Sequence, residues 1–195
     1  MINFNSRLNL AIRNASRAHQ GQYRKGSNTP YIAHPFAVAL ITQRYIDDED
    51  TFIAALLHDV LEDVPSWEYS RDDILRDFGH DVLSIVEDVS EPALDAPVLA
   101  AWTERKNFYI NHLSRSHNSK SAIVSISDKI HNMTEILRDY SECGEGVWNN
   151  FNVDKGREIW FFEEVFGVVR TKDVPPQAID DYAELLRRLK RLDDQ

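Results

Sequence analysis

The ten residues Ala54-Ala55-Leu56-Leu57-His58-Asp59-Val60-Leu61-Glu62-Asp63 join an apolar run to four polar side chains. Apolar side chains at this density predict a buried helix over residues 52–63. Pro65 ends that helix because proline lacks the amide hydrogen that a helix interior requires, and Asp50 and Thr51 are candidates to cap its first turn. The segment therefore predicts a helix that carries polar groups into the protein interior.

The four polar residues of this segment form two pairs at helical spacing. His58 and Glu62 are four residues apart, as are Asp59 and Asp63, so the members of each pair project from adjacent parts of the helix surface. An imidazole and carboxylates side by side on a buried helix form half of a divalent metal site. The alternative is an ordinary helix end with a few solvated acids, which a His-Asp pair alone would favour.

Two further parts of the chain supply the same kinds of ligand. Asp128 lies in an otherwise apolar helical stretch with Asn132 one turn below it, and His34 precedes Pro35 at the start of another predicted helix. Because the residue before a proline is biased away from helical angles, His34 is predicted as the N-terminal cap of that helix. Two histidines and two carboxylates from three helices would offset the charge of one divalent ion.

Helical periodicity extends over nearly the whole chain. The first helix has an apolar face at three- and four-residue steps that comprises Phe4, Leu8, Ile12, Ala15 and Ala18. Residues 21–30 have the composition of a loop, and residues 70–73 have the form of a capping box that opens a helix ending at Gly79. Further helices are predicted at about 80–90, 98–114, 119–139, 155–168 and 177–192, while the short run Ala122–Ile126 is ambiguous between helix and strand.

These patterns predict an all-α helical bundle with no strand-like alternation of comparable strength. No internal repeat, low-complexity tract or long linker divides the chain. We therefore expect a single domain over residues 1–195, with a core that bears the motifs at about 24–140. Helices of about 141–195 are expected to pack on that core.

The acidic balance of the chain limits its partners. Lys and Arg total 22 against 32 for Asp and Glu, which gives a formal net charge of −10. That charge argues against a protein that holds nucleic acid by broad phosphate neutralisation. Residues 1–46 nevertheless contain basic side chains and no Asp or Glu, so an anionic ligand would find local compensation there.

Two observations concern the compartment of the protein. No uninterrupted apolar run is longer than that from Phe52 to Leu57, which is far short of the ~20 residues that span a bilayer, so no membrane crossing is predicted. Cys143 has no second cysteine with which to form an internal disulfide. A reducing cytoplasm is the expected location.

Three blocks of sequence carry a family resemblance: residues 24–35, 55–63 and 128–133. The ordered set His34, His58-Asp59 and Asp128 within them resembles the H…HD…D signature of the HD superfamily of metal-dependent phosphohydrolases. Within that superfamily, the blocks are similar to the (p)ppGpp hydrolase domains of RelA/SpoT-type enzymes and to the small stand-alone alarmone hydrolases. The supporting segments are Arg24-Lys25, Thr29-Pro30-Tyr31-Ile32-Ala33-His34-Pro35 and Asp128-Lys129-Ile130-His131-Asn132-Met133, together with the segment quoted first.

The resemblance implies roles for eleven residues. One divalent metal, usually Mn²⁺ in this branch, is then bound by His34, His58, Asp59 and Asp128. The residues implied to position and activate the attacking water are Glu62 and Asp63. Contacts to the guanine nucleotide (p)ppGpp are implied for Arg24, Lys25, Arg105, Lys129 and Asn132.

The implied activity is removal of the 3′-pyrophosphate from (p)ppGpp to give GDP or GTP and pyrophosphate. Thr134 stands where the family usually has arginine, Val60 and Val64 replace common threonines, and Asn28 replaces a glycine. After residue 140 the likeness fades. These departures keep open an HD phosphohydrolase that acts on another nucleotide or phosphoester. A catalytically silent module that binds a nucleotide or a partner is a further alternative, against which the complete set of ligands and acids speaks.

Other groups are predicted to be structural. His131 points about 100° away from Asn132, so it is expected to neighbour the site or to be structural, and His19 is expected to be an ordinary histidine. The aromatic residues expected in the core are Trp148, Phe151, Trp160, Phe161 and Phe162. A helical stripe that could dock on the domain or on a second copy of the chain, as a homo-oligomer, comprises Ile179, Tyr182, Leu185, Leu186 and Leu189.

Overall fold

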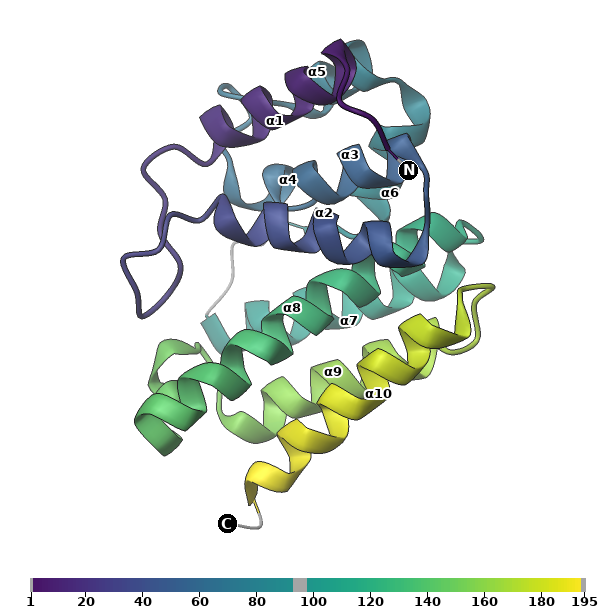
Figure 1. The fold of residues 1–195 in the computed structure, drawn as a ribbon. Helices are drawn as coiled ribbons and strands as arrows, with labels where there is room; N and C mark the ends of the chain where they lie inside the picture. The colour runs from purple at the N-terminus through teal and green to yellow at the C-terminus, as the bar shows by residue number, and fades with distance from the viewer. Residues whose placement is uncertain (1, 93–97, 194–195) are drawn as a thin grey trace.

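A computed structural model describes residues 2–92 and 98–193, and within these ranges the fold is all-helical, as predicted (Figure 1). The first half contains α1 (Ser6–Ala18), α2 (Ala33–Tyr45), α3 (Glu49–Leu57), α4 (Val60–Asp63), α5 (Arg71–Phe78) and α6 (His80–Asp88). The second half contains α7 (Val98–Arg115), α8 (Ser119–Cys143), the 3₁₀ helix η1 (Gly144–Asn150), α9 (Lys155–Val169), α10 (Pro176–Lys190) and the 3₁₀ helix η2 (Arg191–Asp193). The nearest approach to a strand in these residues is an isolated bridge between Tyr23 and Pro30.

The helices form layers that α8 joins. α1 and α5 lie at one end of the molecule, α2, α3 and α6 follow, and α9 and α10 lie at the other end, beyond α7 and α8 (Figure 1). α8 packs on α2 and also on α10, so it contacts both halves. Every residue of α8 from Ser121 to Ile130 is buried, because this helix runs through the core and has no solvent-facing side there.

The helix predicted over residues 52–63 differs from the one observed. α3 begins at Glu49, because Asp48 has an extended backbone and its side chain accepts from the Thr51 amide at 2.9 Å. The prediction of Asp50 or Thr51 as the cap was therefore wrong. The helix also breaks after Leu57 and restarts at Val60, so the i, i+4 argument does not describe how His58 and Glu62 lie.

The start of α2 also differs from the prediction. His34 lies inside the first turn rather than at the cap, because the turn at Pro30 already begins the helix: Ala33 N–H donates to Pro30 O and His34 N–H donates to Tyr31 O. Pro35 then occupies the third helical position, where its missing amide hydrogen would in any case have no partner within the helix.

Local signals elsewhere predicted the structure well. Ser70 and Asp73 form the predicted capping box, and Gly79 follows α5 with φ +87°. The ambiguous run Ala122–Ile126 is helical within α8. The C-terminal stripe docks on the chain itself, as Tyr182 and Leu189 are fully buried where α10 packs on α8 and α9.

In the described ranges, no helix is both long enough and apolar enough to cross a membrane. The aromatic residues predicted for the core are Phe161 and Phe162, which are buried, and Trp148, Phe151 and Trp160, which are partly buried against it. One connected cluster of apolar side chains runs from Leu8 of α1 to Leu189 of α10.

The loop between α1 and α2 makes a close contact that only glycine permits. Gly26 has φ +72°, and a Cβ on it would lie 2.8 Å from Cγ of Asn150 in η1. The positive φ alone disfavours an alanine there by about 1–2 kcal/mol. We expect Gly26→Ala to lower the free energy of unfolding by at least that amount in urea titrations.

The double variant Gly26→Ala/Asn150→Ala separates the two causes of that loss. It removes the amide group that the new methyl would meet but keeps the unfavourable φ. We expect it to recover part of the loss, and full stability in Gly26→Ala would contradict the described contact. Gly21→Ala, in the same loop, also has a positive φ but no atom within 4 Å of its Cβ, so it serves as the control for the backbone effect.

Candidate active site

Four side chains predicted as metal ligands converge from three parts of the fold. His34 on α2 and His58 and Asp59 at the break between α3 and α4 offer ligand atoms that all lie within 4.8 Å of one another. Asp128 on α8 places Oδ1 3.2 Å from His34 Nε2 and 3.8 Å from His58 Nε2. The site thus holds two imidazoles and two carboxylates, a donor set that suits a divalent cation.

His58 shows how well this donor set fits a cation. Its Nδ1 lies 2.9 Å from the carbonyl oxygen of Ala55, which can only accept, so Nδ1 carries a hydrogen, and in the neutral ring Nε2 carries the lone pair. Nε2 is buried and forms no hydrogen bond, although Asp59 Oδ1 lies 3.1 Å away. A lone pair facing a carboxylate is unfavourable unless a positive charge lies between them.

The same electrostatics appear in the pKa values of the cluster. Burial on its own would lower the pKa of His58, but the carboxylates of Asp59 and Asp128 raise it to about 9. Burial would raise the pKa of Asp128, yet Lys129 and the two histidines hold it well below its usual range. The cluster therefore attracts positive charge, whether a proton or a metal ion supplies it.

Both carboxylates of the cluster have donors behind them. Tyr31 O–H donates to Asp59 Oδ2 at 2.8 Å, and Asn132 Nδ2 donates to Asp128 Oδ1 at 2.6 Å. Lys129 Nζ lies 2.5 Å from the other oxygen of Asp128. The sequence blocks contained Tyr31 without a role for it, because its contact with Asp59 is visible only once the fold is known.

The two predicted catalytic acids lie beside the cluster. Glu62 Oε1 accepts from the backbone N–H of Glu91 at 2.6 Å. Enclosure by the protein, the carboxylate of Glu91 and that of Asp59 raise the pKa of Glu62 to about 8. Burial and Asp59 likewise raise the pKa of Asp63. Both acids still face the cavity, so they can exchange protons with a molecule bound there.

All eleven sequence-predicted site residues line one cavity of about 600 Å³. Arg24 reaches across it, with its guanidinium 3.0 Å from Asn132 Oδ1 and over the ring of Tyr31. Lys129 is buried between the rings of Tyr109 and Phe161 as well as paired with Asp128. The structure brings the predicted residues together, and their roles stay predictions.

Arg105 lies beside an acid from another part of the chain, Glu91. Its Nε lies 3.6 Å from Glu91 Oε2 and forms no hydrogen bond within the described chain, and the same glutamate accepts from Lys106 Nζ at 2.6 Å. Glu91 is a site residue that sequence reasoning missed, since no motif surrounds it.

Two histidines support the cluster from outside. His131 Nδ1 lies 2.9 Å from His34 Nδ1, consistent with the expected neighbour of the site, and burial together with His34 and Arg24 lowers the pKa of His131 to about 4. His19, expected to be ordinary, is buried and lies 2.7 Å from Gln22 Oε1, and Gln22 donates to the backbone oxygen of Asp63.

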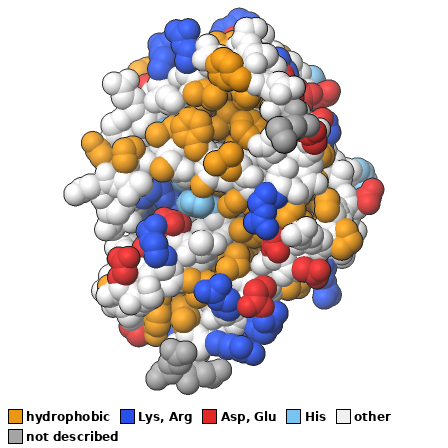
Figure 2. Space-filling model, viewed as in Figure 1, with side chains coloured by type: hydrophobic (Ala, Val, Ile, Leu, Met, Phe, Trp, Pro, Cys, Tyr) orange, Lys and Arg blue, Asp and Glu red, His pale blue; other side chains and the backbone are white. Residues whose placement is uncertain are grey.

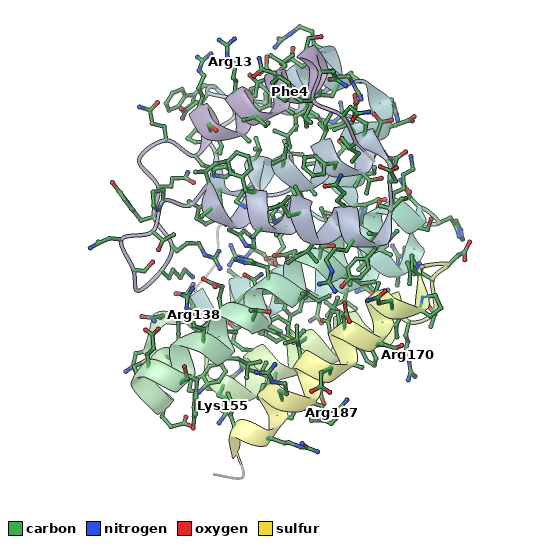
Figure 3. All side chains as sticks on the ribbon, in the orientation of Figure 1. Phe4, Arg13, Arg138, Lys155, Arg170 and Arg187 are labelled. Atoms are coloured by element: carbon green, nitrogen blue, oxygen red, sulfur yellow. The ribbon has the colours of Figure 1, made fainter. Side chains whose placement is uncertain are left out.

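The surface around the cavity mixes charges of both signs. Figure 2 shows histidine atoms between basic and acidic side chains near the middle of the face that Figure 1 presents. Arg138, labelled in Figure 3, belongs to α8 and lines the cavity beyond Asn132. Phe4 and Arg13, also labelled there, lie at the top of the molecule in this view, away from Arg138. Basic side chains thus lie around the candidate metal ligands although the net charge of the whole chain is −10.

Comparisons with known proteins agree with this geometry. Residues 11–152 match the family model described as HD domain. A guanosine-3′,5′-bis(diphosphate) 3′-pyrophosphohydrolase of Haemophilus influenzae is 37% identical over 121 residues, which cover 61% of this chain and 17% of that protein. The bifunctional (p)ppGpp synthase/hydrolase SpoT of Escherichia coli K12 is 37% identical over 129 residues, covering 65% and 18%. The chain thus spans less than a fifth of the length of these relatives.

Solved structures share the fold. One described as a metazoan ortholog of SpoT that hydrolyzes ppGpp superposes with a TM-score of 0.76 at 24% identity, over 96% of this chain and 98% of that one. The Listeria monocytogenes EGD-e protein lmo0812 superposes with a TM-score of 0.67 at 27% identity, over 80% and 97%. The chain therefore belongs to the HD domain family of phosphohydrolases and is related to the (p)ppGpp hydrolase domains of SpoT/RelA-type enzymes.

Proposed function

We propose that the protein is an Mn²⁺-dependent hydrolase that removes the 3′-pyrophosphate from (p)ppGpp. The observation that carries this proposal is the convergence of His34, His58, Asp59 and Asp128 at a cavity that basic side chains also line. Relatives named as 3′-pyrophosphohydrolases of guanosine-3′,5′-bis(diphosphate) support the choice of substrate.

Two imidazole nitrogens and two carboxylates fit Mn²⁺, which accepts both nitrogen and oxygen ligands. A bound divalent ion would polarise the phosphoryl oxygen and lower the pKa of a coordinated water. The protein holds the ligands ready for it: Ala55 O fixes the proton of His58, and Tyr31 fixes an oxygen of Asp59.

The acids Glu62 and Asp63 are placed to handle the proton of the attacking water. The water oxygen forms a bond to the phosphorus that is attached to the ribose 3′ oxygen. The bond between this phosphorus and the ribose 3′ oxygen breaks. One of the two carboxylates accepts the proton of the water, and the ribose oxygen takes up a proton to become a hydroxyl. GDP or GTP and pyrophosphate leave. The raised pKa of Glu62, about 8, favours proton exchange at this acid near neutral pH, and the pKa of Asp63 is raised as well.

The basic residues compensate the charge of the substrate. A chain of net charge −10 repels a polyanionic nucleotide at long range, so cations must lie where the phosphates bind. Arg105 and Lys25 line the cavity and can contact phosphate oxygens. Asn132 lies farther along α8 toward Arg138, and Arg24 reaches it from the loop between α1 and α2. This arrangement supports a nucleotide that extends from the metal cluster toward residues 24 and 132.

Product analysis with purified protein tests the proposal. With ppGpp and Mn²⁺ we expect GDP and pyrophosphate, separated by ion-exchange chromatography. Asp59→Ala and EDTA should each abolish turnover because they remove a ligand or the metal, whereas Asp72→Ala, which changes an aspartate on the exposed side of α5, should retain it.

Other outcomes would contradict the proposal in distinct ways. Intact ppGpp together with turnover of another nucleotide would show a phosphohydrolase of different specificity. No turnover over a panel of nucleotides, with Mn²⁺ bound in titration, would show a binding module. Thermal melts of Asp59→Ala are needed beside the assays, so that unfolding is not taken for loss of chemistry.

The pKa of Glu62 gives a pH-dependent prediction for the metal-free protein. A carboxyl whose pKa is raised on folding contributes stability at low pH, and this contribution is lost as pH rises through the raised value. In EDTA we expect Glu62→Gln to raise the Tm relative to wild type at pH 8 and to change it little at pH 5. An effect of Glu62→Gln on the Tm that is equal at pH 5 and pH 8 would contradict the prediction.

A further inference from the structure

The two nitrogens of His34 face different partners. Nε2 lies 3.2 Å from Asp128 Oδ1 and 3.4 Å from Asp59 Oδ2, so it points into the metal cluster. Nδ1 lies 2.9 Å from Nδ1 of His131, and the two ring centroids are 4.8 Å apart. His34 is almost fully buried, so solvent does not replace this hydrogen bond.

We infer that His131 is a positioning residue, which holds His34 in the orientation and tautomer that leave Nε2 free for a metal ion. The inference rests on the metal cluster of the proposed function, and it assigns His131 no contact with the substrate. His131 lies three residues after Asp128, so one turn of α8 supplies a candidate ligand and also the support of a candidate ligand on α2.

The argument follows from the single proton between two facing nitrogens. A neutral imidazole carries hydrogen on one nitrogen only. If His34 Nδ1 donates to His131, then His34 Nε2 has a lone pair and can bind a metal. If His131 donates instead, His34 must hold its hydrogen on Nε2, where it would block the metal. His131 as the acceptor thus selects the tautomer that can bind a metal.

His58 provides a contrast within the same cluster. Its Nδ1 donates to the backbone oxygen of Ala55, a partner that no side-chain substitution removes. The partner of His34 is a side chain, so the affinity of the cluster for metal depends on residue 131. His131 is only partly buried, so its other nitrogen can meet its hydrogen-bonding needs with solvent.

A comparison of two substitutions tests this role through metal affinity and needs no turnover. Asparagine carries its Oδ1 on Cγ, as histidine carries Nδ1, so His131→Asn can still accept the hydrogen of His34. Leucine cannot accept it. We expect His131→Leu to bind Mn²⁺ about 10–100-fold more weakly than wild type, the usual cost of losing such a supporting contact, and His131→Asn to stay within about threefold.

The measurement is a titration of Mn²⁺ followed by the paramagnetic resonance signal of the free aqueous ion. His80→Leu, the same change at an exposed histidine on α6, should bind as wild type does. Thermal melts in EDTA establish that each variant is folded. Wild-type affinity in folded His131→Leu would overturn the inference, as would equal weakening by leucine and asparagine.

The outcome is separable from the test of the proposed function. Protein that binds Mn²⁺ but leaves ppGpp intact contradicts the proposed substrate and says nothing against His131. Equal affinity in wild type and His131→Leu contradicts the role of His131, even where ppGpp is hydrolysed.

Discussion

Negative charge held inside the protein governs the arrangement of the site. Asp59 and Asp128 direct oxygens at the same two imidazoles, and taking carboxylates out of water is costly unless positive charge and hydrogen bonds replace it. Tyr31 and Lys129 supply part of that replacement from opposite sides. Because the groups come from α2, from the break after α3 and from α8, the packing of these helices and the electrostatics of the cluster stabilise each other.

The sequence predicted those features that depend on nearby residues. The capping box at Ser70 and the long helical stretch of α8 were confirmed, because hydrogen bonds between neighbours and apolar periodicity determine them. The break between Leu57 and Val60 was not foreseen, since no glycine or proline marks it.

In the site, too, features that depend on nearby residues were predictable and features that depend on distant residues were not. Three motif blocks contained ten of the eleven predicted residues that line the cavity, all but Arg105, because each block is a short run with recognisable chemistry. Tyr31, Glu91 and His131 act on partners 28, 29 and 97 positions away, so no local pattern reveals their contacts. Residue types were thus predictable, whereas the hydrogen bonds that orient them required the fold.

The burial of α8 limits where single residues can be inserted into the chain or deleted from it. α8 is 25 residues, roughly 37 Å at 1.5 Å per residue, and its middle contacts α2 on one side and α10 on the other. One residue inserted before Asp128 would turn everything after it by about 100°, taking Asp128, Lys129 and Asn132 out of the cavity together. Gains and losses of single residues are therefore barred from the part of α8 that precedes Asn132, while the loop after α9 can absorb them.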